Sequence, residues 1–396
     1  MQGDGAQGVH SARRAPSHGD ALVTPADALH LTGEWRDLAE NAVEANPFYS
    51  PALLLPALAH FPDDDPRVAV IRNEGGLLIG LAPVAPLRGY SRLPVRYMAT
   101  WMHPHCFFAA PIVRSGYEPE FFRRLYALLD DKGAFLRLRH LDSDGLLFAA
   151  AISAVHETGR LASASARYGR AMLGSGWRTD AYLEGSLDGK KRKELRRLRN
   201  RLEEIGPVRF ETLAATADVA RWIDDFLALE AAGWKGREGT ALASEGPSAA
   251  FFRDAIAGAH DAGALRFHRL SAGAATLAMI VNFIEQGQGF SFKIAHDETY
   301  ARFSPGVMIE IEMMKALEAE GGISFIDSCA QADHPMIDRL WRERRTLSAL
   351  NISRRDAPSK AMFHVLMTLE RASEAARKRK AQTRKAQIPK DSDDDL

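Results

Sequence analysis

Two carboxylates in the second half of the chain stand where they could remove a proton from a substrate. Glu230 ends an apolar helical pattern just before Gly233-Trp234, and Asp327 ends the apolar strand pattern ISFID. Each has a plainer alternative, because Glu230 could pair with Lys235 on a helix surface and Asp327 could cap loop N–H groups. We take both as candidate general bases, and Tyr300 as the candidate donor of a proton to a leaving group.

A lysine on a predicted strand adds a candidate binding group. Residues 289–295 alternate apolar and polar side chains, which places Lys293 on the polar face. Lys293 could bind an acidic group of a substrate, or it could form a buried ion pair with one of the two carboxylates. Trp234 could line a pocket or belong to the core. We group Trp234, Lys235 and Lys293 as candidate substrate-binding residues.

The cysteine and histidine patterns predict neither a metal site nor a covalent intermediate. His103-Pro104-His105-Cys106 is a single cluster without a second pair of ligands. Cys329 has no histidine placed by sequence to activate its thiol. With only these two cysteines, far apart in sequence, no disulfide framework is expected, and a reducing cytosol fits.

The segment that follows Lys293 predicts a seat for a phosphate or pyrophosphate. Ser304 suits an N-cap, Pro305 suits the first helical position, and Gly306 leaves room for a ligand to approach the backbone. The N–H groups at such a helix start favour an anion. We therefore predict a cofactor-binding site from these three residues together with Arg302 and Val307.

The order of elements places this helix start at the ligand edge of a sheet. Residues 208–327 predict strand, two helices, three strands, a helix from Ser304 and a last strand that ends at Asp327. Short Gly-bearing links between the three middle strands predict hairpins, and the helix predicts a right-handed crossover to a parallel strand. Ligands of such sheets bind where the pattern of strand directions changes.

The first half of the chain gives a weaker version of the same order. Residues 32–172 alternate predicted helices and strands but contain no counterpart of the helix start at Ser304. We therefore expect a disordered N terminus over 1–30, a lobe over 31–175 and a second, ligand-binding lobe over 176–355. Residues 356–396 are expected to form a C-terminal helix and a disordered charged tail.

The bulk composition excludes several classes of function. Lys plus Arg and Asp plus Glu number 51 each, so the chain has no net field to attract DNA. Its longest apolar runs are about half the roughly 20 residues that a membrane helix needs, and residues 1–30 lack the apolar core of a signal peptide. We expect a cytoplasmic protein without a transmembrane segment.

One strongly basic helix leaves room for a polyanionic partner. Residues 190–205 predict an amphipathic helix with Leu195, Leu198, Leu202 and Ile205 on the packed face. Such a helix could bind RNA, anionic lipid or polyanionic sugar, or it could be a solvated connection between lobes. It has no interleaved aromatic residues for base stacking, which argues against sequence-specific reading of RNA.

The chain resembles the GNAT fold of acyl-CoA-dependent N-acyltransferases. It is most similar to the acyltransferase family named after the cellulose biosynthesis protein CelD, relatives of the FemABX peptidyltransferases. The patches that carry the resemblance, in order, are 185–206, 229–241, Phe292-Lys293 with Asp297 and 304–306, and Asp327, with a weaker match at 46–51. It covers most of residues 32–350. The chain departs from ordinary GNAT enzymes because Arg302–Val307 contains one glycine where their Gln/Arg-x-x-Gly-x-Gly/Ala turn stands.

The resemblance implies an α+β fold of two tandem GNAT-like lobes, each a mixed, mostly antiparallel sheet flanked by helices. It also implies an acyl-CoA donor, for which we expect acetyl-CoA, and transfer to an amine of a small molecule or amino sugar in exopolysaccharide or envelope synthesis. FemABX relatives suggest aminoacyl-tRNA as an alternative donor, bound through the basic helix. A further alternative is a non-catalytic partner of a polysaccharide synthase.

Overall fold

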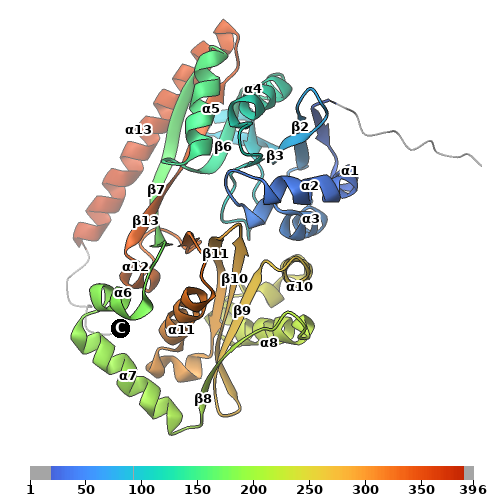
Figure 1. Ribbon diagram of the computed structural model, residues 1–396. Coiled ribbons are helices and arrows are strands. Elements are labelled where there is room, and N and C mark those ends of the chain that lie inside the picture. Colours follow the sequence, from blue (N-terminus) through green and yellow to red (C-terminus); the bar gives the residue numbers. More distant parts are fainter. Residues whose placement is uncertain (1–18, 92, 388–396) are drawn as a thin grey trace, which may run out of the picture.

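One mixed, mostly antiparallel sheet runs through the whole protein (Figure 1). The computed structural model describes residues 19–91 and 93–387. The strand order is β1-β2-β3-β4-β6-β13-β7-β12-β11-β10-β9-β8, with β5 (Ile112–Val113) paired to β3. The α+β prediction is confirmed.

The first lobe contains β1 to β6 and the helices around them. Its strands are β1 (Ala21–Val23), β2 (Arg67–Arg72), β3 (Leu78–Tyr90), β4 (Leu93–Thr100) and β6 (Phe135–Asp142). Its helices are α1 (Pro25–Ala28), α2 (Thr32–Glu40), α3 (Pro51–His60), α4 (Glu118–Leu129) and α5 (Leu146–Glu157). The apolar sides of α2, α4 and α5 pack on the sheet because their buried side chains repeat at helical spacing, whereas α3 packs against α10 (Gly246–Asp261) of the second lobe.

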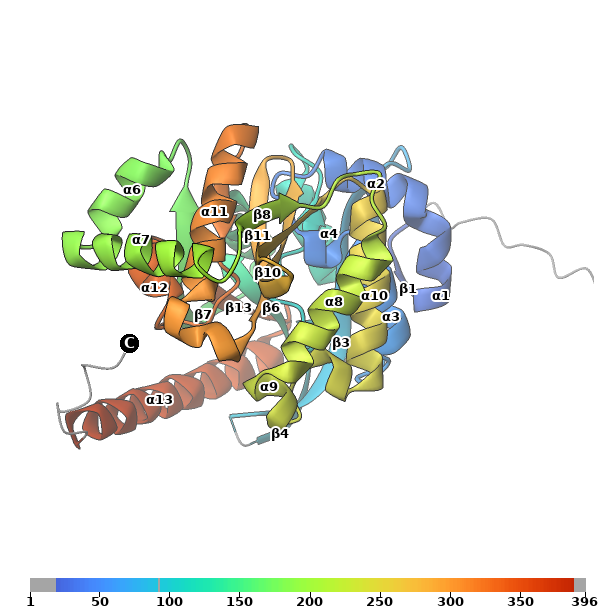
Figure 2. The same ribbon diagram turned by 90° about the horizontal axis from the view of Figure 1, so that it is seen from below.

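The second lobe follows the element order that the sequence predicts. Its strands are β8 (Val208–Thr212), β9 (Leu265–Ala272), β10 (Ala275–Glu285), β11 (Gln288–His296) and β12 (Phe325–Asp327). Helices α8 (Val219–Ala232) and α10 (Gly246–Asp261) cover one face, and α11 (Pro305–Glu320) covers the other (Figures 1 and 2). Helix α11 returns the chain to β12, which pairs parallel with β11, as expected for the crossover.

The two lobes are joined more intimately than a division at residue 175 implies. Strand β13 (Glu343–Ser353), placed by the sequence in the second lobe, pairs antiparallel with both β6 and β7 (Ala162–Gly174). The end of β7 pairs in turn with β12. The lobes also meet where α3 packs against α10. The sheet is therefore continuous across the junction.

A helical arm covers the outer side of α11. Helices α6 (Thr179–Ser186) and α7 (Gly189–Glu203) lead from β7 to β8. Leu195, Leu198 and Leu202 of α7 are buried as predicted, but Ile205 lies beyond the helix and is half exposed. The other helical pieces of the second lobe are α9 (Trp234–Arg237), 3-10 turns over Leu242–Ser244 and Glu298–Phe303, and α12 (Ile337–Leu340).

The predicted N-terminal disorder is wrong for residues 19–30. Strand β1 pairs with β2, Thr24 caps α1, and the Asp20 carboxylate accepts hydrogen bonds from Arg124 and from the N–H of Arg72. These nonlocal partners order a segment that looks polar and weakly patterned in sequence. Residues 1–18 lie outside the described part of the chain.

A long C-terminal helix ends the described chain. Helix α13 (Ala357–Gln387) buries Phe363, Leu366 and Met367 against the first lobe. The predicted charged tail falls partly on this helix and partly on residues 388–396, which lie outside the described range. Among the described helices, none is long and apolar enough to cross a membrane.

Candidate functional site

The start of α11 borders the pocket that best fits the predicted cofactor site. The pocket measures about 630 Å³, and Ser304, Pro305, Gly306 and Val307 form part of its wall. The other walls come from α7, the end of β11 and α12, through Leu187, Asp188, Lys191, Leu195, His296, Met336, Arg339 and Leu340 among others. It therefore combines apolar walls with two cationic side chains beside a helix N terminus, which suits an anionic ligand with an apolar part.

The helix start differs in detail from the prediction. Pro305 occupies the first helical position, but Ser304 adopts a left-handed conformation (φ 53°, ψ 50°) and its hydroxyl makes no capping hydrogen bond. Ser304 therefore occupies the predicted N-cap position, and its carbonyl accepts from the Met308 N–H at 3.1 Å, but the predicted capping by its hydroxyl is wrong. Arg302 is exposed, stacks its guanidinium over the Phe303 ring at 4.8 Å and does not line the pocket.

A second pocket of about 500 Å³ lies beside the first. The two pockets share Leu187 and Leu195. Arg192, Arg196 and Arg199 line the second pocket, together with apolar side chains of α11. The basic helix α7 thus forms a wall of both pockets.

Strands β11 and β12 part at the level of the proposed site. They pair only over Gln288–Phe290 and Phe325–Asp327, although β11 continues to His296. On its other edge β11 pairs with β10 throughout, with a bulge opposite Val281 and Asn282. The backbone of residues 291–296 is therefore not paired with β12 and could meet an extended ligand.

The candidate acceptor-side residues lie on the opposite face of β11 from α11. Ile294 packs in the core beneath α11, and strand alternation turns the neighbouring Lys293 toward α8. The Glu230 carboxylate of α8 is 4% exposed and accepts from the Lys235 Nζ at 2.7 Å and from the Leu242 N–H at 2.8 Å. The pair with Lys235, which the sequence offered as the alternative to a catalytic role, is formed, but the Glu230 carboxylate is buried and does not lie on a helix surface.

Trp234 and Gly236 lie in the same region as Glu230 and Lys235. Trp234 is 48% exposed, so it is not a core residue, and it borders a small pocket together with Glu230 and Lys235. A Cβ on Gly236 would lie 1.8 Å from the carbonyl oxygen of Ala231, so a side chain cannot fit there. The close approach of backbone explains the glycine in the sequence patch 233–236.

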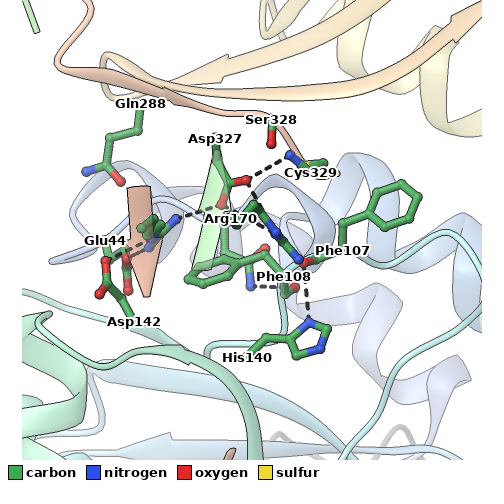
Figure 3. A network of polar contacts seen from close by, with 12 residues as sticks. Glu44, Phe107, Phe108, His140, Asp142, Arg170, Gln288, Asp327, Ser328 and Cys329 are labelled. Atoms are coloured by element: carbon green, nitrogen blue, oxygen red, sulfur yellow. Dashed lines mark hydrogen bonds and ion pairs between the residues drawn. The ribbon is translucent and has the colours of Figure 1, made fainter. Parts of the chain in front are cut away.

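Asp327 is buried in an ion-pair network at the lobe junction (Figure 3). Its carboxylate lies 3.4 Å from Arg170 Nη1 and 3.2 Å from Arg345 Nη1, and it accepts from the Cys329 N–H at 2.8 Å. Arg345 also pairs with Glu44 and Asp142 of the first lobe. The network ties β12, β7 and β13 to the first lobe. Lys293 takes no part in it.

Burial perturbs the titratable groups in and beside the network. Burial raises the pKa of Glu44 to about 7, against the lowering effect of Arg345. Burial also raises the pKa of Cys106 to about 12 and that of Cys329 well above its ordinary value. Thiols held in the protonated form are poor nucleophiles.

A group of polar residues from the first lobe was missed by the sequence reading. The Phe107 carbonyl accepts from Arg170 Nη1 at 2.8 Å and from His140 Nδ1 at 3.3 Å (Figure 3). Arg170 Nη2 also donates to the Tyr168 hydroxyl at 2.8 Å. His140 sits at an irregular pairing of β6 with β13 and has a φ of 50°. Left-handed backbone at such a residue is a signal of function, but sequence does not show it.

The remaining candidates are placed as follows. Tyr300 lies in the turn before α11, where its ring packs near Phe303 and does not line the large pocket. His103 and His105 are packed between Phe61 and Phe251. Within residues 19–91 and 93–387, no group of three or more His, Cys, Asp or Glu side chains could hold a metal ion.

Comparison with known proteins supports an acyltransferase domain. Residues 189–334 match the family described as acetyltransferase (GNAT) domain. This range contains α7, the seat at α11, Glu230, Lys293 and Asp327. No curated protein matches the chain in sequence.

Similar solved structures span nearly the whole fold at low sequence identity. One is the C-terminal domain (DUF2156) of a putative lysylphosphatidylglycerol synthetase from Agrobacterium fabrum, with TM-score 0.53 and 14% identity, covering 86% of this chain and 96% of that one. FemX has TM-score 0.53 and 11% identity, covering 84% and 96%. L-PGS from Bacillus licheniformis has TM-score 0.50 and 13% identity, covering 89% and 99%.

These likenesses establish the fold, whereas the family match covers residues 189–334 and supports an acyltransferase domain there. The match does not single out the CelD family, and it leaves the acyl donor open. Residues 189–334 are thus similar to GNAT-type acetyltransferase domains, and the chain shares its fold with FemX and the L-PGS domains.

Proposed function

We propose that this protein is an N-acyltransferase that uses acyl-CoA, with acetyl-CoA as the first donor to test, and an amine of a small molecule or amino sugar as acceptor. The observation that supports this proposal is the pocket of about 630 Å³ at the start of α11, with Lys191 and Arg339 on its walls. A pyrophosphate would accept from the first-turn N–H groups, and the apolar walls would cover the pantetheine arm. We place this reaction in exopolysaccharide or envelope synthesis, in the cytoplasm, on the family resemblance alone.

Direct attack of the amine on the thioester fits the side chains of this site. The amine nitrogen attacks the thioester carbonyl carbon, the C–S bond breaks, and the amine proton leaves to a base while the thiolate is released. Both cysteines have raised pKa values and are buried, which argues against a covalent acyl-enzyme. An N–H of β11 beyond Phe290, free of pairing with β12, could stabilise the developing oxyanion.

The donor and acceptor would meet across the edge of β11. The α11 side of the strand carries Ile294 and the donor pocket, whereas the α8 side carries Lys293, Glu230 and Trp234. Of the two carboxylates, we retain Glu230 as the candidate base, since its Oε1 is bound only by the partly exposed Lys235. We assign Asp327 a positioning role, because two arginines and a backbone N–H hold its carboxylate.

Titration calorimetry with acetyl-CoA and longer acyl-CoAs tests the donor. A Cβ on Gly306 would lie 3.6 Å from Met336 Sδ and 3.9 Å from His296 Nδ1, which is ordinary contact. Gly306→Ala should therefore bind acyl-CoA within about threefold of wild type, whereas the indole of Gly306→Trp must enter the pocket and should weaken binding at least tenfold. Equal affinity of the two variants, or no binding to wild type at low salt, would refute the seat.

Aminoacyl-tRNA is the second candidate donor, and the exposed face of α7 favours it. This helix presents the exposed side chains Lys190, Lys193, Arg196, Arg197 and Arg201 beside both pockets. Binding of RNA through this helix would fall steeply with salt, and it would be lost when Arg192, Arg196 and Arg199, which line the second pocket, are neutralised. Acyl-CoA binding that survives 200 mM salt while tRNA binding is absent would exclude this donor.

A further inference from the structure

Lys293 is a largely buried cation near the centre of the lobe junction. Its ammonium lies 5.6 Å from the centre of the Phe107 ring and 5.2 Å from that of Phe292. Burial lowers its pKa to about 8, with Glu230 acting to raise it and Lys235 acting to lower it. Two aromatic rings stabilise a cation only modestly compared with a carboxylate.

No carboxylate neutralises this charge within the described residues. Glu230 is the acid that influences Lys293 most, but both of its oxygens are occupied, by the Lys235 ammonium at 2.7 Å and by the Leu242 N–H at 2.8 Å. Asp327 is likewise held by Arg170 and Arg345. The sequence leaves two roles open for Lys293, an ion pair within the protein and binding of an acidic group of a substrate. The ion pair is not formed among the described residues, so the binding role remains.

The histidines near Lys293 add no compensating charge. Burial, reinforced by the positive charge of Lys293, lowers the pKa of both His103 and His105 to about 3. Both rings are therefore neutral at physiological pH. The titratable groups around Lys293 are then Glu230, Lys235 and these two histidines, and together they leave one positive charge in excess.

Hydrogen-bonding groups gather around the same phenylalanine. The Phe107 ring faces Lys293, and its carbonyl accepts from Arg170 and His140. Because the carbonyl can only accept, His140 must carry its proton on Nδ1, which leaves Nε2 as a free acceptor in the neutral ring. Burial, followed by the charge of Arg170, lowers the pKa of His140 to about 4, so the neutral form dominates.

These groups come from both lobes and remain reachable. Lys293 lies on β11 of the second lobe, whereas His140, Tyr168 and Phe107 lie on β6, β7 and the loop after β4. All four side chains are partly exposed. The Tyr168 hydroxyl, which accepts from Arg170, can still donate to a ligand.

We infer that the acceptor of this acyltransferase carries an anionic group, a phosphate or a carboxylate, and that Lys293 binds that group at the lobe junction. Tyr168 supplies a hydroxyl donor beside it, and His140 Nε2 accepts a hydrogen bond from a hydroxyl or amine of the same ligand. That the bound molecule is the acyl acceptor rests on the proposed function, whereas anion binding at Lys293 can be measured without catalysis.

Calorimetric titration with inorganic pyrophosphate and with malonate tests the site directly. The protein carries Gly306→Trp, so that the donor seat is closed, and is compared with the double variants that add Lys293→Met or Lys132→Met. Lys132 is an exposed lysine paired with Asp131, so its loss serves as the control. Lys293→Met removes a buried charge without a carboxylate partner, so it should fold at least as well as its parent.

We expect Lys293→Met to weaken binding of one of the two probes at least tenfold and Lys132→Met to leave it unchanged. The probe that responds identifies phosphate or carboxylate as the recognised group. Equal binding by both double variants, or no heat with either probe in the parent, would overturn the inference. Neither outcome depends on whether acyl-CoA binds.

A second experiment links the anion to the acceptor. Wild type should acetylate glucosamine 6-phosphate, or a carboxylate-bearing amine, with kcat/KM at least tenfold above glucosamine. Lys293→Met should bring the two acceptors of the pair within about threefold of each other through a rise in KM for the anionic one. A Lys293→Met variant that keeps the wild-type preference would contradict the assignment. Failure of the wild-type protein to bind acyl-CoA would instead refute the proposed donor.

Discussion

A buried glutamate in α11 gives the sharpest prediction of stability. Glu310 is 3% exposed, and its Oε2 has no hydrogen-bond partner within the described residues. Burial alone raises its pKa from 4.5 to about 8. A carboxylate without a partner is costly in such surroundings, so the folded protein holds this side chain as a neutral acid.

The linkage between protonation and folding gives the sign and size of the effect. Because the folded-state pKa is raised, the stability that Glu310 contributes is fully present below about pH 4.5 and is lost as pH rises through about 8. In that window the unfolded chain releases a proton that the folded chain keeps. The cost is about 1.4 kcal/mol per pH unit, or about 2.5 kcal/mol between pH 5 and pH 7.

Glu310→Gln removes the ionisation and keeps the shape. Its free energy of unfolding should be close to that of wild type at pH 5 and higher than wild type by about 2.5 kcal/mol at pH 7. Urea denaturation at half-unit pH intervals measures the difference, with the exposed Glu184→Gln as the control that should show no such trend. A difference between Glu310→Gln and wild type that stays flat from pH 5 to pH 8 would mean that Glu310 is not held as a neutral acid in the folded protein.

Three other predictions concern the junction and the two substrates. Arg345→Met leaves buried carboxylates uncompensated and should lower the free energy of unfolding by about 3–5 kcal/mol in urea, whereas the exposed Arg178→Met should change it by less than about 0.5 kcal/mol. Because the Lys293 pKa is lowered to about 8, kcat/KM for an anionic acceptor should fall above that pH relative to a neutral acceptor, and parallel pH profiles would count against its binding role. Arg196→Ala should weaken acyl-CoA binding less than threefold in calorimetry, since Arg196 lines only the second pocket; a tenfold loss would mean that the donor extends along α7.

Local sequence patterns were enough to predict many of the elements of the second lobe. The patterns at residues 289–295 and Ser304-Pro305-Gly306 predict β11 and the start of α11, because both depend on neighbours in sequence. The strict alternation predicted for β11 is wrong, because a bulge in its pairing with β10 leaves Phe290 and Phe292 in one core cluster and Ile294 in the other. The position of the Ser304 hydroxyl could not be predicted, since its left-handed backbone is set by the preceding 3-10 turn.

Nonlocal pairing explains what the sequence did not reveal. Strand β13 inserts between β6 and β7, a choice that no local pattern encodes. The same holds for the ion pairs of Lys293 and Asp327. The sequence offered Glu230 or Asp327 as a partner of Lys293, but Glu230 pairs with Lys235, the alternative that the sequence also offered, and Asp327 pairs with two arginines that it did not suggest. His140 escaped notice because its role depends on the Phe107 carbonyl.

We propose that the protein moves an acyl group from acyl-CoA to an amine. Mass spectrometry of a mixed pool of amines and amino sugars, incubated with isotopically labelled acetyl-CoA, is the decisive measurement, with Gly306→Trp as the blocked control. We expect a labelled N-acetyl product and free CoA in equal amounts with wild type, and neither above background with Gly306→Trp. Labelled product formed equally by both proteins would contradict the α11 seat, and transfer to the pool only from aminoacyl-tRNA would contradict the donor.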